Sequence, residues 1–229
     1  MVERAELRER LAWLRAEVSQ QERRQGLAEG QVRILPVTKG HGPEAPLAAV
    51  AVGLHELGEN YVQECAAKQL ALDESGGQTV RWHMLGHLQR NKARQGAELF
   101  SVVETVDSLA VAQALSRARG DGEPLPVLCE VDFTGLPDRG GYAPERLRQD
   151  LPAIWELPGL KVLGLMTVAT RDEPASCFEM CRQLRDELAQ LLGQELPELS
   201  MGMSGDFREA IAEGSTEVRV GSLLFGPRG

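Results

Sequence analysis

The sequence predicts an α/β fold: a single (β/α)8 TIM barrel with an extra helix at its N-terminus. Eight short apolar runs alternate with helical stretches, an order typical of a parallel sheet with right-handed crossovers. The chain has 229 residues, the size of one such barrel. An open, doubly wound sheet is the alternative. It is disfavoured because Gly40 and Gly42 do not extend into the GxGxxG phosphate fingerprint after the first run.

An amphipathic helix over residues 3–25 comes first. Its apolar residues recur at helical spacing among arginines and glutamates, and they are Leu7, Leu11, Leu14 and Val18. We therefore expect one domain, 1–229, made of an N-terminal helix, 1–25, and a barrel, 33–226.

The barrel elements follow in alternation. The predicted strands are 33–39, 55–60, 81–86, 101–107, 126–133, 160–168, 198–204 and 217–225. The predicted helices are 44–52, 61–72, 90–99, 108–119, 144–156, 174–192 and 206–212. The second and third strands are only weakly β-like, so the order of the elements identifies them rather than their own periodicity.

Composition and charge narrow the function classes. Hydrophobic residues make up 42% and charged residues 26%, the balance of a globular protein. The net charge of −9 disfavours nucleic acid as a partner, because phosphate binding needs a basic face. No apolar run approaches the ~20 residues that cross a membrane, and no signal peptide is visible. The four cysteines lack metal-binding spacing, which indicates a cytoplasmic setting, and the acidic surface favours a monomer.

The chain has only four lysines, and the barrel geometry sorts them. Functional sites of such barrels lie at the carboxyl ends of the strands. Lys68 is expected in mid-helix and solvated, Lys161 at the opposite end of the barrel, and Lys92 at the rim of the site. Lys39 ends the first strand, so its amine is expected in the mouth, either forming imines or pairing with Glu59.

An anion site is expected beside Lys39, formed by the loops after the seventh and eighth strands. Glycines there let the backbone approach an anion, although tight packing alone also explains them. Asp206 and Glu209 predict an N-terminal capping pair for the helix that follows. An imine-forming amine beside an anion site predicts a phosphorylated aldehyde, either pyridoxal 5′-phosphate (PLP) or the sugar phosphate of an aldolase.

Several motifs resemble the pyridoxal phosphate homeostasis protein family, which is similar to the N-terminal domain of alanine racemase. The resemblance runs from about Ile34 to Gly226 in chain order. The motifs that carry it are PVTK (36–39), GENYVQE (58–64), WHMLGHLQRNK (82–92), GLMT (164–167), LSMGMSGDF (199–207) and VRVG (218–221). Blocks of this length are specific.

The resemblance implies a barrel that holds PLP as a Schiff base on Lys39, with Arg219 facing the pyridine nitrogen and Asn60 lining the pocket. Its implied phosphate-binding residues are Ser204, Gly205, Gly221 and Ser222. Its implied residues around the cofactor are Met84, His87 and Met166. The family usually carries lysine where this chain has His41 and Arg139, so transfer of the cofactor from lysine to lysine is in doubt.

Arginine only donates hydrogen bonds, so a ring nitrogen facing Arg219 stays unprotonated and is a weak electron sink. This disfavours transaminase-type chemistry and is compatible with a racemase or with a plain carrier. Racemases of this type also take a catalytic tyrosine from a second domain, which we do not expect in this chain. The favoured function is therefore a non-catalytic PLP carrier that serves PLP-dependent apoenzymes. The alternatives are a small PLP-dependent amino-acid racemase and the imine-forming aldolase.

Overall fold

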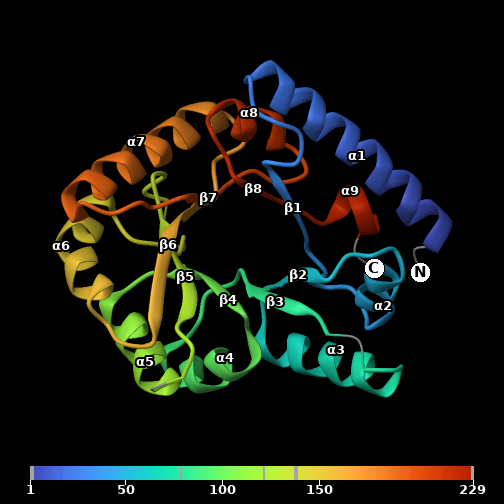
Figure 1. Ribbon diagram of the computed structural model, residues 1–229, viewed down its shortest axis with the longest axis horizontal. Coiled ribbons are helices and arrows are strands. Elements are labelled where there is room, and N and C mark those ends of the chain that lie inside the picture. The colour runs from blue at the N-terminus through green and yellow to red at the C-terminus, as the bar shows by residue number, and fades with distance from the viewer. Residues whose placement is uncertain (1–2, 78, 121, 137–138, 228–229) are drawn as a thin grey trace.

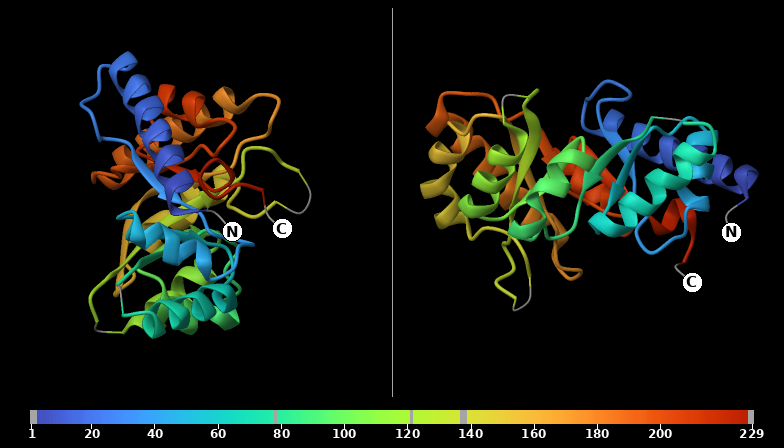
Figure 2. Two further views of the ribbon diagram at one scale, coloured as in Figure 1. Left: turned by 90° about the vertical axis from the view of Figure 1, so that its right-hand side faces the viewer. Right: turned by 90° about the horizontal axis from the view of Figure 1, so that it is seen from below.

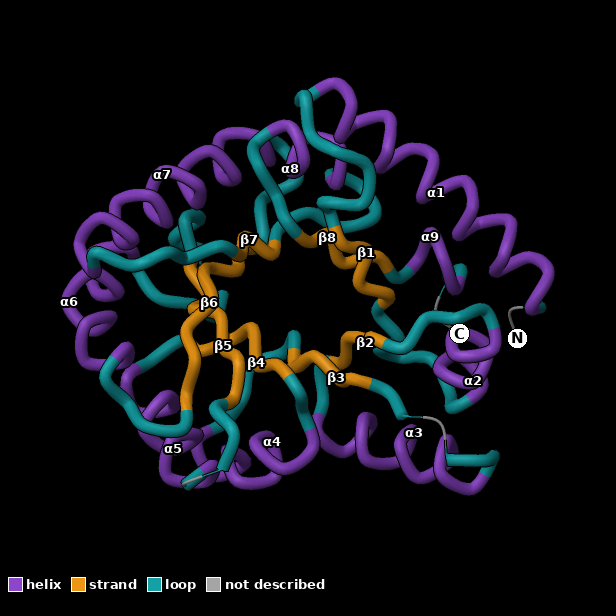
Figure 3. The backbone as a smooth tube through the Cα atoms, in the orientation of Figure 1, coloured by secondary structure: helices purple, strands orange, loops and turns teal. Residues whose placement is uncertain are grey.

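Eight parallel strands form a ring in the computed structural model, which describes residues 3–77, 79–120, 122–136 and 139–227 (Figures 1 and 3). The ends of the expected domain, 1–2 and 228–229, lie outside the described residues. The strand order is β1-β8-β7-β6-β5-β4-β3-β2. An isolated bridge between Val37 and Gly58 joins β1 to β2, and the Thr38 amide donates to the Gly58 carbonyl at 3.0 Å. The predicted (β/α)8 barrel is therefore confirmed.

The strands are shorter than predicted at their carboxyl ends, because the final residues leave the ladder to form the loops of the barrel mouth. They are β1 (Arg33–Pro36), β2 (Glu56–Glu59), β3 (Arg81–Met84), β4 (Val102–Val106), β5 (Leu125–Val131), β6 (Leu160–Thr167), β7 (Glu198–Ser200) and β8 (Glu217–Val220). The largest difference follows β8: residues 222–225 form a short helix, α9 (Ser222–Phe225), where the sequence predicts strand.

Helices cover the outside of the ring (Figure 1). They are α2 (Glu44–Ala51), α3 (Val62–Glu74), α4 (Ala93–Leu99), α5 (Leu109–Arg119), α6 (Pro144–Trp155), α7 (Pro174–Leu192) and α8 (Phe207–Ala212), with a 3₁₀ turn, η1 (Arg90–Lys92), before α4. The loops that follow β5 and β6 project from the same end of the barrel (Figure 2). Among the described residues, no helix has both the length and the apolar character needed to cross a bilayer.

The predicted N-terminal helix is α1 (Arg4–Arg24), which lies along the outside of the ring against α8 and α9 (Figure 1). Its apolar stripe is buried, as the spacing predicts. Arg10 Nη1 donates to the Leu224 carbonyl at 3.1 Å, and Arg208 pairs with Glu17. The first and last helices of the chain therefore brace the same side of the barrel.

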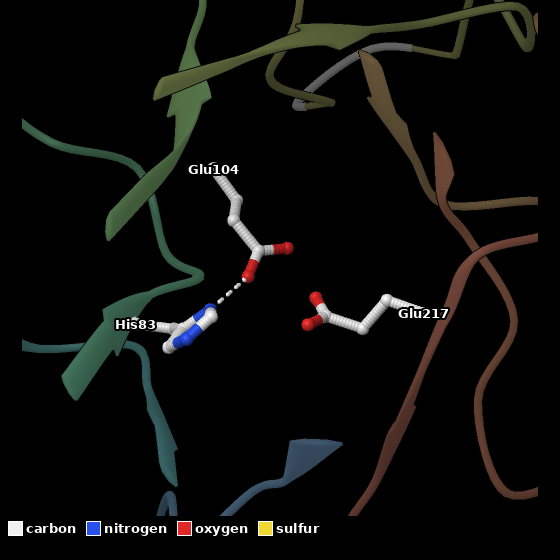
Figure 4. Close-up of side chains that lie close together, drawn as sticks. All are labelled: His83, Glu104 and Glu217. Atoms are coloured by element: carbon white, nitrogen blue, oxygen red, sulfur yellow. Dashed lines mark hydrogen bonds and ion pairs between the residues drawn. The ribbon is translucent and has the colours of Figure 1, made fainter. Parts of the chain in front are cut away.

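The space inside the ring holds a hydrogen-bonded polar cluster, to which β3, β4 and β8 contribute His83, Glu104 and Glu217 (Figure 4). His83 Nδ1 lies 2.7 Å from Glu104 Oε1, and Ser200 Oγ lies 2.5 Å from Glu104 Oε2 and 3.1 Å from Glu217 Oε1. Arg33 pairs with Glu217 at 3.3 Å. The three side chains offer ligand atoms within 4.8 Å of one another. His83 Nδ1 and the two carboxylates are engaged in hydrogen bonds or in the Arg33 ion pair, whereas His83 Nε2 is buried and has no hydrogen-bond partner among the described residues.

The cluster binds protons unevenly. Burial raises the pKa of the Glu217 carboxyl to about 8, and the neighbouring Glu104 carboxylate adds to the rise. Burial opposes ionisation of Glu104 too, but its hydrogen bond to His83 outweighs this and lowers the pKa of Glu104. Burial likewise disfavours charged His83, and the bond to Glu104 outweighs it, so the imidazole pKa is raised. Protonation is therefore favoured at Glu217 and His83 and disfavoured at Glu104.

Glu217 makes the stability of the folded state depend on pH between about 4.5 and 8. The unfolded chain releases this proton near pH 4.5 and the folded chain keeps it to about pH 8. This group therefore lowers the free energy of unfolding as pH rises between these values, by up to about 1.4 kcal/mol per pH unit. Glu217→Gln carries no titrating proton, so it should gain stability relative to the wild type from pH 5 to pH 8 in urea unfolding. If the free energies of unfolding of the wild type and of Glu217→Gln changed in parallel with pH, the raised pKa of Glu217 would be contradicted.

Candidate functional site

A cleft of about 1000 Å³ opens at the carboxyl ends of the strands, where the sequence predicts the site. Residues that follow β1, β2, β6, β7 and β8 contribute to its lining. The predicted site residues in the lining are Lys39, Asn60, Met166, Ser204, Gly205, Arg219, Gly221 and Ser222. The structure therefore brings the amine, the arginine and both glycine-bearing loops to one cavity.

Lys39 follows β1 on a turn that the backbone defines closely. The Val37 amide donates to the Val220 carbonyl at 3.0 Å, and the His41 amide donates to the Thr38 carbonyl at 3.1 Å. Gly40 has a φ of 70°, a left-handed conformation that glycine adopts readily. The chain thus turns directly after Lys39, whose half-buried side chain lines the cleft.

The loops after β7 and β8 form the candidate anion site. At Gly205 an added side chain would meet open space, while at Gly221 it would begin 3.1 Å from the Val37 carbonyl. Asp206 does not cap α8 with its side chain as predicted, because its carboxylate accepts the Met203 amide at 2.5 Å. Asp206 therefore shapes the loop beside Ser204.

Arg219 is 5% exposed and is held from two sides. Its Nη1 donates to Ser200 Oγ at 2.9 Å, and its Nη2 donates to the Thr167 carbonyl at 2.8 Å. Because Ser200 also bonds to Glu104, it connects the Arg219 guanidinium to the polar cluster inside the barrel. Arg219 thus presents a fixed positive charge to the cleft, one that donates and never accepts a hydrogen bond.

Asn60 supplies an independent sign that the cleft suits a polar ligand. Its Oδ1 is buried and has no hydrogen-bond partner among the described residues. A buried polar atom without a partner costs about 1–3 kcal/mol, so a bound polar group would relieve this cost. The donor set fits PLP: an amine for the aldehyde, a cation for the ring and glycine-bearing loops for the phosphate.

Two predicted site residues lie elsewhere. Met84 is 1% exposed and belongs to the apolar core. His87 is exposed, and its Nδ1 lies 2.7 Å from Asp107 Oδ2. Neither is part of the cleft lining, so cofactor contact by these two stays an expectation of the resemblance alone.

The two positions at which the family usually carries lysine, His41 and Arg139, lie in different places. His41 lines the cleft, with its ring 5.7 Å from that of Phe225. Arg139 is exposed in the loop after β5 and does not line the cleft. Within the described part of the chain, Lys39 is thus the sole lysine of the lining.

Sequence reasoning missed two charged groups and misplaced a third. Arg171 follows β6 and lines the cleft, and its place after a strand was a usable signal. Glu130 on β5 interacts with the Arg219 charge, and burial together with Asp107 raises the pKa of its carboxyl to about 7. Lys68 is wrongly expected in solvent: it is 3% exposed, because its ammonium pairs with the buried Glu59.

Comparison with known proteins gives a consistent result. The family model for the alanine racemase N-terminal domain matches residues 13–229. The pyridoxal phosphate homeostasis protein of Pseudomonas aeruginosa is 39% identical over 225 residues, covering 96% of this chain and 95% of the relative. The protein of that name from Escherichia coli K12 is 36% identical over 222 residues, with 95% of each chain covered.

Solved structures agree with this. PipY of Synechococcus elongatus, determined with PLP bound, superposes with a TM-score of 0.85 at 38% identity, covering 96% of this chain and 100% of its own. Alanine racemase of Clostridium difficile superposes with a TM-score of 0.75 at 18% identity, covering 96% of this chain and 56% of the enzyme, a likeness of fold. The chain therefore belongs to the pyridoxal phosphate homeostasis protein family.

Proposed function

We propose that this protein binds PLP as a Schiff base on Lys39 and acts in PLP homeostasis as a cytoplasmic, monomeric carrier that stores the cofactor and delivers it to PLP-dependent apoenzymes. The observation that carries the proposal is the shared cleft, where Lys39, Arg219 and two glycine-bearing loops meet. The names of the relatives, and the PLP bound to PipY, support the same cofactor.

Each part of the cleft has a distinct task in this proposal. Lys39 supplies the amine that joins the aldehyde carbon. Ser204 and Ser222 offer hydroxyls to the phosphate, and Gly205 and Gly221 give it access to backbone amides. Asn60 offers its unpartnered oxygen, or after rotation its amide nitrogen, to the ligand.

Arg219 limits the kind of chemistry that the bound cofactor would support. PLP supplies an electron sink to its enzymes when the ring nitrogen is protonated, usually beside a carboxylate. Here the group proposed to face that nitrogen is the Arg219 guanidinium, held by its hydrogen bonds to Ser200 and Thr167. It donates hydrogen bonds and cannot accept one from a protonated ring nitrogen. This disfavours transaminase-type chemistry and is compatible with a carrier or with a racemase. The described cleft lining contains no tyrosine to supply the second base of a racemase, which favours the carrier.

A small amino-acid racemase is the second candidate, and Glu130 is the observation that favours it. A carboxyl whose pKa is raised to about 7 by burial and by Asp107 exchanges protons readily near neutral pH. Glu130 interacts with the charge of Arg219, so such a group stands close to the proposed cofactor site.

Lys39→Ala should abolish the visible absorption of the PLP-loaded protein. In the wild type, borohydride should fix PLP to the peptide that contains Lys39. The exposed Lys161→Ala variant, altered at the other end of the barrel, is the control and should keep its colour. Colour that survives in Lys39→Ala would reject the lysine assignment. Colourless wild type that traps a sugar phosphate would favour the aldolase.

Removing both hydroxyls, as Ser204→Ala with Ser222→Ala, should weaken PLP binding at least about tenfold, because each bond to a charged group contributes about 1.5–3 kcal/mol. Pyridoxal, which lacks the phosphate, should bind the variant and the wild type equally well. Equilibrium dialysis with both ligands measures the difference. An equal loss for both ligands would place the phosphate elsewhere.

Exchange of the α-hydrogen of alanine or serine in D₂O distinguishes a carrier from a racemase. A carrier should exchange no faster than free PLP does, because no tyrosine lines the described cleft to act as a second base opposite Lys39. Proton NMR measures the exchange for the wild type and for Glu130→Gln. Exchange above the free-cofactor rate that disappears in Glu130→Gln would establish the racemase instead.

A further inference from the structure

Lys68 is buried on α3 without a place in the cleft lining. Taking an ammonium out of water costs several kcal/mol unless good partners surround it. Three oxygens do so: the Glu59 carboxylate, the Thr38 carbonyl at 2.7 Å, and Glu64 Oε2 at 3.7 Å. We call Lys68, Glu59 and Glu64 the Lys68 cluster. An apolar pair would fill the same space with less desolvation, so the cluster calls for an explanation beyond stability.

The cluster holds the chain on both sides of Lys39. On one side, Thr38 Oγ1 donates to Glu59 Oε1 at 2.7 Å, and its carbonyl accepts from Lys68. On the other side, the Gly40 amide donates to Glu64 Oε2 at 3.2 Å. Thr38 and Gly40, the two neighbours of Lys39, are therefore both hydrogen-bonded to the Lys68 cluster, whose residues come from β2 and α3.

The same cluster reaches a second residue of the cleft. Glu59 Oε2 accepts the backbone amide of Asn60 at 3.1 Å, while its Oε1 serves Thr38 and Lys68. Glu59 thus connects Lys39, after β1, with Asn60, after β2. The relative placement of amine and amide depends on one carboxylate that is 0% exposed.

These contacts lie at the seam where the barrel closes. The neighbouring strands β1 and β8 pair along four residues, whereas the isolated Val37–Gly58 bridge is what joins β1 to β2 in the described chain. A side chain at Gly58 would begin 2.4 Å from Leu85 Cδ1 and 3.3 Å from Val37 Cγ2, so neighbouring side chains already fill the space beside this bridge. With so little backbone pairing, side chains must fix the end of β1 relative to β2.

We propose that the Lys68 cluster is the positioning element of the cofactor site. It fixes the backbone at Thr38 and Gly40 so that the Lys39 amine enters the cleft, and it fixes Asn60 beside that amine. The proposal rests on the proposed Schiff base at Lys39. In this proposal, Lys68, Glu59 and Glu64 act through the main chain and do not touch the ligand.

The sharpest test uses Glu64, whose half-exposed side chain can be changed without disturbing the buried pair. Glu64→Ala removes the acceptor of the Gly40 amide and should weaken PLP binding about three- to tenfold with little change in the melting temperature. Glu64→Gln keeps an acceptor oxygen and should restore binding. Gln63→Ala, at the exposed neighbouring position on α3, is the matched control and should equal the wild type.

A second variant tests the centre of the cluster. Lys68→Met should lower PLP affinity by more than about tenfold, because it leaves Glu59 buried without its cation. The pH midpoint of the Schiff-base absorption should also shift in Lys68→Met and in Glu64→Ala, a change that a loss of stability alone does not produce. Thermal unfolding of each variant is measured in parallel.

The outcomes separate this proposal from the one on which it rests. If borohydride labels wild-type protein away from Lys39, the Schiff-base assignment fails and the positioning role fails with it. If the wild type is labelled on Lys39, but Glu64→Ala and folded Lys68→Met match its PLP affinity and pH midpoint, only the positioning role is overturned. The cluster would then be an ordinary structural ion pair.

Discussion

Closure of a parallel ring is the constraint from which the rest of this structure follows. All eight strands run in the same direction, so every strand ends at one rim, and residues far apart in the chain meet there. Lys39 and Arg219 lie 180 positions apart in the sequence, yet they line one cleft because β1 and β8 are paired neighbours. The pairing of the first and last strands is therefore enough to bring both ends of the sequence to one site.

Closure also encloses polar groups, and each enclosed charge has to find a partner. Inside the ring, Glu104 bonds to His83 and to Ser200, and Ser200 in turn supports Arg219. Outside the ring, the Lys68 cluster ties the ends of β1 and β2 together. The two networks therefore reach the cleft from opposite sides of the sheet: one fixes the cation, and the other holds the backbone around the amine.

Alternation of elements and the position of each residue relative to a strand end were enough to predict the barrel, Lys39 and the two anion loops. The positions of Met84 and His87 outside the cleft lining, and of the chain after Gly221, depend on where each strand stops. Met84 is the last residue of β3 and belongs to the apolar core, and His87 lies beyond the strand with its side chain in solvent. The chain after Gly221 coils into α9, since pairing of β8 ends at Val220.

Lys68 shows what sequence periodicity lacks. Helical spacing indicates which face of α3 is apolar, but burial of an ammonium depends on acceptors that β1 and β2 bring from elsewhere. The motif GENYVQE contains both acidic members of the cluster, Glu59 and Glu64, but nothing in the letters says that they face the lysine. Such pairing is a property of the tertiary structure. From the sequence alone, a single lysine on a helix is predicted to be exposed to solvent.

The acidic net charge of −9 is also reflected in the cleft, where cationic and acidic side chains lie together. The cations that line it are few: Lys39, Arg171 and Arg219, with acidic Asp206 and Glu209 in the same lining. An extended polyanion finds no continuous basic surface in such a setting, whereas one small phosphate can be met by backbone amides and hydroxyls. In the proposed site, local geometry rather than overall charge would therefore select a small anion. That combination agrees with the proposed binding of one small phosphorylated cofactor.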